Sequence, residues 1–289
     1  QLTWPMIAFG WIINLVQRAA PSMQRILNII NVKPDIADNE NTDKNITEKD
    51  IKGDIVFENV SFKYPLSNNY TLRDINLTIR KGSTLGIIGH TGSGKSTLIN
   101  LIPRAWDITS GNIFIGGKDI KKIPLNVLRR SIGIVPQESF LFSTTIEKNI
   151  SYSGDEISEE EVIKAARQSG LYKDVEDFPD KFKTVLGERG ITLSGGQKQR
   201  TSIARAIYKK PDILILDDSL SAVDTKTEEE ILRQLKEVMK DKTSIIISHR
   251  ISTIKNANNI IVISHNKIAE EGTHNELISA GGIYFDLYK

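Results

Sequence analysis

The sequence contains no cysteine, and this absence excludes disulfide bonds, thiolate metal sites and a cysteine nucleophile. Such a composition fits a reducing compartment. A strong charge of either sign is also lacking, because 38 Lys and Arg residues balance 36 Asp and Glu residues to a formal net charge of +2. Nucleic-acid-binding domains usually carry a marked or clustered basic excess, so we expect no nucleic-acid partner.

The overall composition is that of an ordinary soluble globular protein. Of the 289 residues, 39% are hydrophobic and 26% are charged, which is enough for one large domain or two small ones with a sizeable core. No internal repeat is visible. Because the chain begins with glutamine rather than methionine, we expect a fragment or a processed product.

The N-terminal segment is the most apolar part of the chain. Residues 2–16 are almost entirely apolar. This run is shorter than the roughly 20 residues that a membrane-spanning helix needs. A longer helix that was cut at the start of the chain would leave the same pattern. A buried core helix and a signal peptide are the alternatives. The basic residues Arg18, Arg25 and Lys33 follow the apolar run, which disfavours a signal peptide and suits a cytoplasmic helix end. We expect residues 1–33 to be the end of a membrane helix with its cytoplasmic extension.

The remaining chain divides into a polar linker and an α/β domain. Residues 34–53 are rich in Asp, Asn, Lys and Glu, which is typical of a linker. Residues 54–64 and 71–79 alternate apolar and polar positions, as half-buried antiparallel strands do. Continuous apolar runs at 213–216, 244–247 and 260–263, separated by helical stretches, favour a parallel sheet covered on both faces. The sequence therefore predicts an α/β domain over residues 54–289.

The motif GHTGSGKST at residues 89–97 predicts a phosphate-binding loop. It follows an apolar, strand-like run and opens into a stretch with helical spacing. Glycines let backbone N–H groups surround a phosphate, and a helix N-terminus adds partial positive charge. Lys95 is expected to reach the β- and γ-phosphates, and the Ser96 hydroxyl to take a Mg²⁺ position. The residues expected around the phosphates are Gly89, Thr91, Gly92, Ser93, Gly94, Lys95, Ser96 and Thr97. A glycine-rich turn that merely precedes a helix is the weaker alternative.

Two carboxylates, Asp217 and Asp218, end the apolar run 213–216. In a parallel α/β sheet, ligands lie beyond the carboxyl ends of the strands, so Asp217 is expected beside the phosphate loop, where it would hold Mg²⁺ directly or through water. Asp218 is a candidate base for an attacking water near the γ-phosphate. A solvated pair at a strand end is the alternative, which the phosphate loop disfavours.

Three further features narrow the class. The sequence LSGGQ at residues 193–197 precedes a helical pattern, which makes Ser194, Gly195, Gly196 and Gln197 a second phosphate-binding helix end. Gln137 follows one predicted strand, and His249 follows another. Each residue alone would be an unremarkable polar position, but the order of all these features is very hard to obtain by chance.

Residues 54–289 resemble the nucleotide-binding domain of ATP-binding-cassette (ABC) transporters. Residues 89–97 match the Walker A loop, Gln137 the Q-loop, 193–197 the signature motif, 213–217 the Walker B strand, 221–224 the D-loop and His249 the switch histidine. Tyr64 is similar to the aromatic residue that stacks on adenine; a core or edge-strand tyrosine is the alternative.

The resemblance implies a P-loop NTPase fold. Its parts would be a mainly parallel core sheet, an antiparallel β subdomain and an α-helical subdomain, preceded by an N-terminal helix. It also implies ATP and Mg²⁺ as cofactors. Ser96, Gln137 and Asp217 would lie around the metal, and Asp218, His249 and Gln137 would be catalytic.

Two segments look like those of exporters. Residues 187–190 are similar to a segment typical of ABC exporters, and residues 2–30 are similar to the end of the sixth membrane helix in exporters with fused membrane and nucleotide domains. The resemblance then implies a place at the cell membrane with the nucleotide-binding domain on the cytoplasmic side. The expected partners are a membrane domain and a second ABC half-transporter in a head-to-tail pair. The transported substrate is not encoded in this chain.

One position departs from the family pattern. Walker B is normally followed by glutamate, whereas this chain has Asp218, whose carboxylate is withdrawn by roughly 1.5 Å, and displacement on that scale can cost about a hundredfold in rate. We therefore expect a slow own site and a partner with the efficient site, that is, a heterodimer. There are two alternatives. One is a soluble ABC ATPase that acts on nucleic acid or ribosomes, and the other is a regulatory ATP-binding module with negligible hydrolysis.

Overall fold

The computed structural model describes residues 2–152, 157–187, 193–219 and 225–289, and it divides the chain into two compact units, Gln1–Ala37 and Asp38–Lys289. The first unit is mainly helix α1 (Thr3–Ile30), which contains Pro21 and has no buried residue. Within the described part of the chain, no helix combines the length and apolarity that crossing a membrane requires.

The first layer of the second unit is an antiparallel sheet with the strand order β2-β1-β4-β5. Its strands are β1 (Ile55–Phe62), β2 (Leu72–Ile79), β4 (Ser110–Ile115) and β5 (Lys118–Asp119). Buried and exposed positions largely alternate along β2, because one face of the sheet packs on the core. The predicted antiparallel strands are thereby confirmed.

The second layer is a six-stranded sheet with the order β10-β9-β3-β8-β7-β6. Its strands are β3 (Thr84–Ile88), β6 (Ile132–Val135), β7 (Ile213–Asp217), β8 (Thr243–Ile247), β9 (Asn259–Ser264) and β10 (Lys267–Gly272). All neighbouring pairs are parallel except β10, which runs antiparallel to β9. This arrangement confirms the predicted α/β fold with a mainly parallel core sheet.

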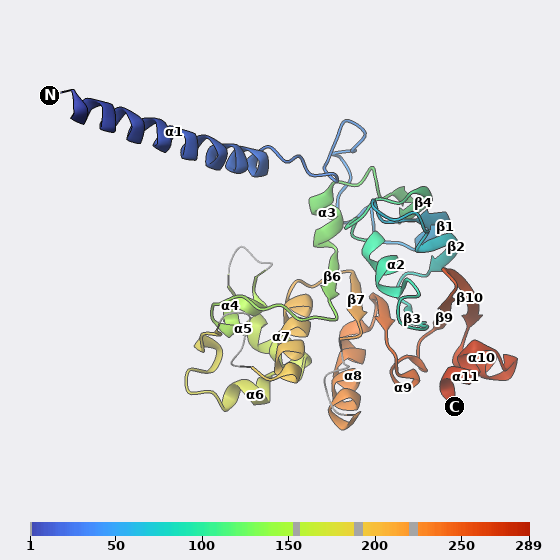
Figure 1. The fold of residues 1–289 in the computed structure, drawn as a ribbon. Coiled ribbons are helices and arrows are strands. Elements are labelled where there is room, and N and C mark those ends of the chain that lie inside the picture. Colours follow the sequence, from blue (N-terminus) through green and yellow to red (C-terminus); the bar gives the residue numbers. More distant parts are fainter. Residues whose placement is uncertain (1, 153–156, 188–192, 220–224) are drawn as a thin grey trace. The chain divides into compact units, whose positions relative to one another are not determined.

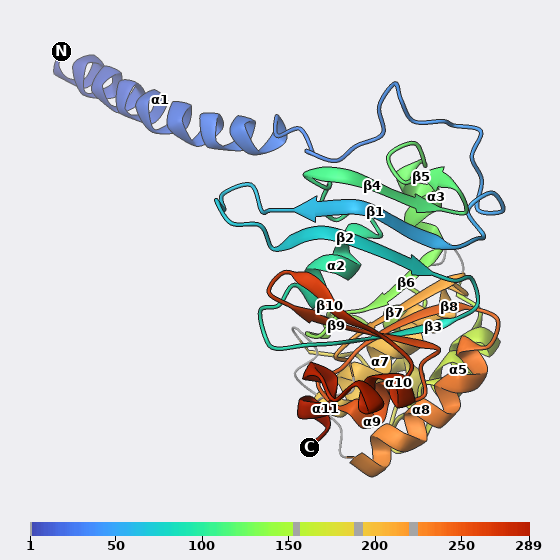
Figure 2. The same ribbon diagram turned by 90° about the vertical axis from the view of Figure 1, so that its right-hand side faces the viewer.

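Helices complete the layers (Figure 1). They are α2 (Lys95–Leu101), α3 (Leu125–Arg130), α4 (Ile146–Ile150), α5 (Glu159–Gln168), α6 (Tyr172–Glu176), the 3-10 helix Lys181–Lys183, α7 (Gly195–Tyr208), α8 (Thr225–Met239), α9 (Ile251–Ile254), α10 (His274–Ala280) and α11 (Ile283–Tyr288). Figure 2 shows α2 between the two sheets, and α7 to α10 on the other side of the central sheet.

The central strands are apolar throughout because both of their faces are covered. On β7, Ile213 and Ile215 belong to the core shared with the antiparallel sheet, whereas Leu214 and Leu216 belong to the core shared with the helices. Every position of β7 is therefore buried, which explains a continuous apolar run rather than an alternating one.

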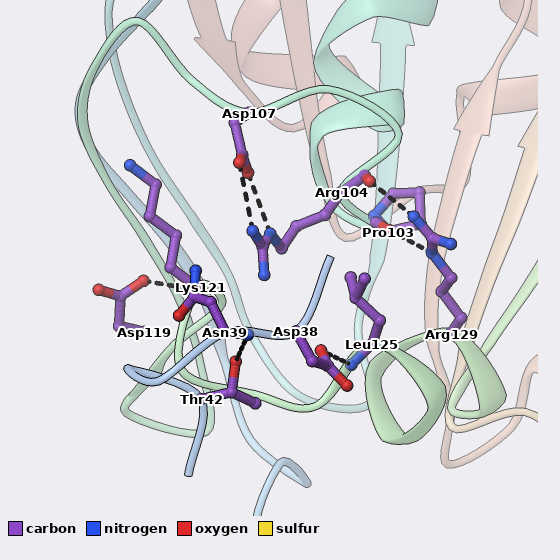
Figure 3. A network of polar contacts seen from close by, with 10 residues as sticks. All are labelled: Asp38, Asn39, Thr42, Pro103, Arg104, Asp107, Asp119, Lys121, Leu125 and Arg129. Atoms are coloured by element: carbon purple, nitrogen blue, oxygen red, sulfur yellow. Dashed lines mark hydrogen bonds and ion pairs between the residues drawn. The ribbon is translucent and has the colours of Figure 1, made fainter. Parts of the chain in front are cut away.

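The second unit begins at Asp38, inside the segment whose composition is typical of a linker. Asp38 accepts a hydrogen bond from the backbone N–H of Leu125 at 2.9 Å, and Thr42 accepts one from Asn39 at 3.0 Å (Figure 3). Ile46 and Ile51 are buried in the core beneath the antiparallel sheet. Two isoleucines thus join this polar segment to the core, a contribution that the average composition of the segment does not reveal.

Candidate nucleotide-binding site

The phosphate loop joins β3 to α2 and depends on glycine at two of its positions. Gly89 has a φ of 153°, and a Cβ there would lie 2.3 Å from the carbonyl oxygen of Ile263. Gly94 has a φ of 103°, and its Cβ would lie 2.9 Å from the carbonyl oxygen of Thr71. A side chain at either position would strain the backbone and meet main-chain atoms that cannot easily move, so the loop geometry follows directly from its sequence.

The side chain of Lys95 bonds to the main chain of the loop. Its Nζ donates hydrogen bonds to the carbonyl oxygens of Gly89 and His90, both at 2.9 Å, and the residue is only 6% exposed. Burial lowers the pKa of Lys95, while Asp217 and Asp218 act in the opposite direction. A poorly hydrated ammonium group gains free energy from an anion placed beside it.

Ser96 and Asp217 form an oxygen-rich pair at the start of α2 and the end of β7. The Ser96 hydroxyl donates to Asp217 Oδ1 at 3.1 Å. Burial raises the pKa of Asp217, the hydrogen bond from Ser96 lowers it, and Asp218 raises it further. A hard divalent cation fits this pair, because it favours oxygen ligands and would compensate the buried carboxylate.

Magnesium needs few protein ligands, since phosphate oxygens and water supply the rest. Consistent with this, the described residues contain no cluster of three or more His, Cys, Asp or Glu side chains suited to a metal ion.

A cavity of about 370 Å³ brings most of the predicted residues together. It is lined by Tyr64, Thr71, Thr91, Gly92, Gly94, Lys95, Ser96, Thr97, Gln137, Asp217, Asp218, Ile247 and His249. Gln137, Asp217 and His249 follow or end the neighbouring strands β6, β7 and β8. The cavity therefore lies at the carboxyl ends of the parallel strands, where α/β sheets bind their ligands.

Two residues predicted to surround the phosphates do not line this cavity. Gly89 takes part through its backbone conformation, and Ser93 is buried, with no hydrogen-bond partner for its hydroxyl oxygen among the described residues. Conversely, Thr71 and Ile247 line the cavity although no motif marks them. Thr71 directly precedes β2 and Ile247 ends β8, so only the fold places them here.

Asp218 has an unusual backbone conformation, with a φ of 42°. Its N–H donates to the carbonyl oxygen of Ile247 at 3.0 Å. Aspartate tolerates this left-handed conformation better than residues with longer side chains, and such strain is concentrated at functional sites. The main chain thus turns at Asp218 while its side chain remains at the cavity.

Tyr64 is held at the cavity edge by its neighbours. Its hydroxyl lies 2.9 Å from Thr97 Oγ1, and its ring meets Phe62 and Trp106 edge-on at centroid distances of 4.9 and 5.3 Å. Edge-to-face contacts of this kind fix ring orientation. Trp106 is a supporting residue that the sequence patterns do not reveal.

The signature residues Ser194, Gly195, Gly196 and Gln197 do not line the cavity of their own chain. Ser194 caps α7: its Oγ accepts from the N–H of Gln197 at 3.2 Å, and Gln197 Oε1 accepts from the N–H of Ser194 at 3.0 Å. The D-loop residues Ser221, Ala222, Val223 and Asp224, and residues 188–190 of the exporter-like segment, lie outside the described residues.

The fold and the phosphate loop together define a P-loop nucleoside triphosphatase domain. Residues 72–221 match the family model of the ABC transporter, which is half of the chain. The chain therefore belongs to the ABC transporter family and contains its ATPase domain. This match confirms the resemblance seen in the sequence.

Two curated proteins illustrate what the chain is similar to. The chain is 44% identical to the probable multidrug resistance ABC transporter ATP-binding/permease protein YheI of Bacillus subtilis, over 100% of this chain and 48% of that protein. It is 43% identical to the ATP-dependent lipid A-core flippase of Syntrophus aciditrophicus, over 96% of this chain and 45% of that protein.

A solved structure of a bacterial Atm1-family ABC exporter with ATP bound matches with a TM-score of 0.89 and 35% identity, over 99% of this chain and 50% of that one. The chain thus spans about half the length of the relatives it matches.

Proposed function

We propose that this chain is the ATP-binding and ATP-hydrolysing part of an ABC exporter. The observation that carries the proposal is the cavity at which buried Lys95 and the Ser96–Asp217 pair meet Gln137, Asp218 and His249. Lys95 offers a cation for phosphate, and Asp217 and Asp218 offer carboxylates for metal and water. These are the components that phosphoryl transfer to water requires.

Each residue then has a distinct task. Lys95 and the loop N–H groups bind the phosphates, and Tyr64 lies against adenine. Ser96, Asp217 and Gln137 would hold Mg²⁺, which neutralises charge on the phosphates when bound. Asp218 orients the attacking water and accepts its proton, and His249, which also lines the cavity, would approach the γ-phosphate.

The functional unit in this proposal is a head-to-tail pair of cassettes. The signature end of α7 is a second phosphate-binding helix end, yet its residues do not line the cavity of their own chain, so one nucleotide can use both ends only across a pair. The likeness to exporters that are twice as long supports a membrane domain and a second half-transporter as partners. Residues 1–33 would then be the end of the last membrane helix together with its cytoplasmic extension.

Asp218 supports a pair with unequal sites. Its carboxylate is one methylene shorter than the family's glutamate, so we propose a slow own site and a partner that carries the efficient one. A regulatory module without appreciable hydrolysis remains the second candidate, and the same residue favours it. The names of similar proteins, among them an ATP-binding/permease protein, a flippase and an exporter, argue against a soluble ABC ATPase.

Replacing Asp217 with asparagine tests the metal assignment. Because burial raises the pKa of Asp217 in the folded state, folding favours its protonated form, and its unfavourable effect on stability develops as the pH rises through the folded-state pKa. Without ligands, Asp217→Asn is therefore expected to raise the free energy of unfolding at pH 7, an advantage that vanishes below about pH 4, where the carboxyl group is protonated in both states.

The ligand response is expected to change in the opposite direction. At a hundred times its dissociation constant, MgATP stabilises the parent chain by about 2.7 kcal/mol, and Asp217→Asn should lose the Mg²⁺-dependent part while keeping the response to metal-free ATP. Denaturant titrations at pH 7 and pH 4 measure all these quantities. An unchanged response to Mg²⁺ would show that Asp217 does not contact the metal.

A further inference from the structure

Asp174, on the short helix α6, makes the principal polar contact with the start of α7. Arg200 donates from Nε and Nη2 to Asp174 Oδ2 at 2.9 and 2.7 Å, and Gln197 Nε2 donates to Asp174 Oδ1 at 3.5 Å. The side chains of Arg200 and Asp174 are only 13% and 22% exposed. One carboxylate therefore serves both a guanidinium group and a residue of the signature motif, 26 and 23 positions away.

The contact with Gln197 matters because a glutamine amide has two different ends. Its Oε1 accepts from the N–H of Ser194, and its Nε2 faces the carboxylate of Asp174. A reversed amide would place NH₂ against N–H at Ser194 and oxygen against oxygen at Asp174. Asp174 thus favours the orientation in which Gln197 closes the capping box on Ser194.

The closed capping box sets the shape of the helix end that the proposed function assigns to phosphate. Gln197 donates its own N–H to Ser194 Oγ, and the N–H of Lys198 donates to the carbonyl oxygen of Ser194 at 2.9 Å. With these bonds fixed, the direction of the Ser194 hydroxyl and of the first N–H groups of α7 is fixed as well.

We propose that Asp174 is a positioning residue for the signature motif, which it acts on through Gln197. The proposal rests on the proposed function, because it assigns the ordered end of α7 to a nucleotide held by the partner. Asp174 would contact no nucleotide itself. Because Asp174 lies on α6 and contacts Gln197 and Arg200, a displacement of α6 would be transmitted to the phosphate-binding end of α7.

A purely structural role for Asp174, in which it only ties α6 to α7 through Arg200, makes a different prediction. Exchanging the charges in the double variant Asp174→Arg/Arg200→Asp restores an ion pair between the helices. It leaves Gln197 Nε2 facing a group that accepts no hydrogen bond. If Asp174 only joins α6 to α7, the double variant should behave like the parent chain. If Asp174 positions Gln197, the double variant should behave like Asp174→Ala.

The test compares four full-length chains with the parent: Asp174→Ala, Asp174→Asn, the charge exchange and the control Glu161→Gln. The control removes the partner of Lys210, at 3.0 Å, beyond the opposite end of α7. Asp174→Asn keeps the shape of the side chain and so provides a folded variant if the alanine chain fails to fold.

The first measurement is hydrogen exchange at the backbone N–H groups of Gln197 and Lys198 without nucleotide. We expect exchange about tenfold faster in Asp174→Ala and in the charge exchange, a smaller increase in Asp174→Asn, and no change in the control, as loss of a bond to a charged group predicts. Unchanged exchange in Asp174→Ala, or full rescue by the charge exchange, would overturn the proposal.

The second measurement is the ATP concentration at half-maximal hydrolysis by the assembled pair. It is expected to rise about tenfold in Asp174→Ala and in the charge exchange, with ATP affinity at the chain's own phosphate loop unchanged. Faster exchange combined with unchanged ATP dependence would keep Asp174 as the positioning residue of Gln197 and would contradict the head-to-tail use of the signature motif.

Discussion

Replacing Lys95 with alanine is expected to weaken the binding of ATP about a hundredfold. The Nζ is buried within the loop, so its charge acts on a phosphate through a poorly hydrated environment, in which a charge-assisted hydrogen bond contributes up to ~3 kcal/mol. The unliganded chain should lose little stability, because the variant also removes the cost of burying a cation that the lowered pKa of Lys95 reflects.

Isothermal titration calorimetry with ATP measures the effect of Lys95→Ala directly. Lys210→Ala is the matched control, because this lysine is largely exposed and lies just after α7, away from the cavity. ATP affinity equal to that of the parent chain would show that residues 89–97 are not a phosphate-binding loop, and the assignment of the cavity would be lost with it.

Asp218→Glu is expected to raise hydrolysis at this chain's own site by about ten- to a hundredfold. The longer side chain restores roughly 1.5 Å of reach towards the attacking water, and general bases are sensitive to distance on that scale. The φ of 42° at Asp218 adds a cost, because glutamate tolerates the left-handed region less well, and we expect a stability loss of about 1 kcal/mol. Activity and stability should therefore change in opposite directions.

Single-site ATPase of the assembled pair checks the Asp218 prediction. Asp218→Asn removes the carboxylate and should lower total turnover only slightly, whereas loss of the corresponding carboxylate at the partner's site should abolish most of it. If Asp218→Asn stopped turnover completely, or if two copies of the parent chain formed a fast ATPase, the slow-site proposal would be wrong. If Asp218→Glu still hydrolysed nothing, the regulatory module would be the better account.

Local motifs predicted the phosphate-binding part of the site because their chemistry is contained in a few consecutive residues. The positive φ values at Gly89 and Gly94 favour glycine whatever surrounds the loop, so the glycine spacing of the motif marks both positions. The sequence predicted the parallel strands equally well, because burial on both faces of the sheet requires an uninterrupted apolar run such as β7. These features depend on nearest neighbours in the chain and on the period of the pattern.

Contacts between segments that are distant in the chain could not be predicted from the sequence in this way. Trp106 lies against Tyr64, and Asp174 binds Gln197 and Arg200, only because the fold brings separate elements together. Ile46 and Ile51 were hidden inside a polar segment, where composition averaged them out. A single sequence carries no direct signal for such pairs, because it does not distinguish Asp174 or Trp106 from an aspartate or tryptophan that lies on the surface without a partner.

The head-to-tail pair is the central claim, and the cysteine-free sequence allows a direct measurement of it. In the membrane-reconstituted assembly, Ser194→Cys is introduced in this chain and a single cysteine is placed in the partner's phosphate loop at the position corresponding to Thr91. Ser158→Cys replaces Ser194→Cys in the control, because Ser158 caps α5 in the same way as Ser194 caps α7.

The pair should be linked by a short bifunctional thiol reagent when ATP is present. We predict linkage that depends on ATP, that disappears when the partner's phosphate loop carries the equivalent of Lys95→Ala, and that the Ser158→Cys control does not show. Linkage of equal yield with and without ATP, or no linkage at Ser194 in an assembly that hydrolyses ATP, would contradict the claim that the signature motif completes a nucleotide site across two chains.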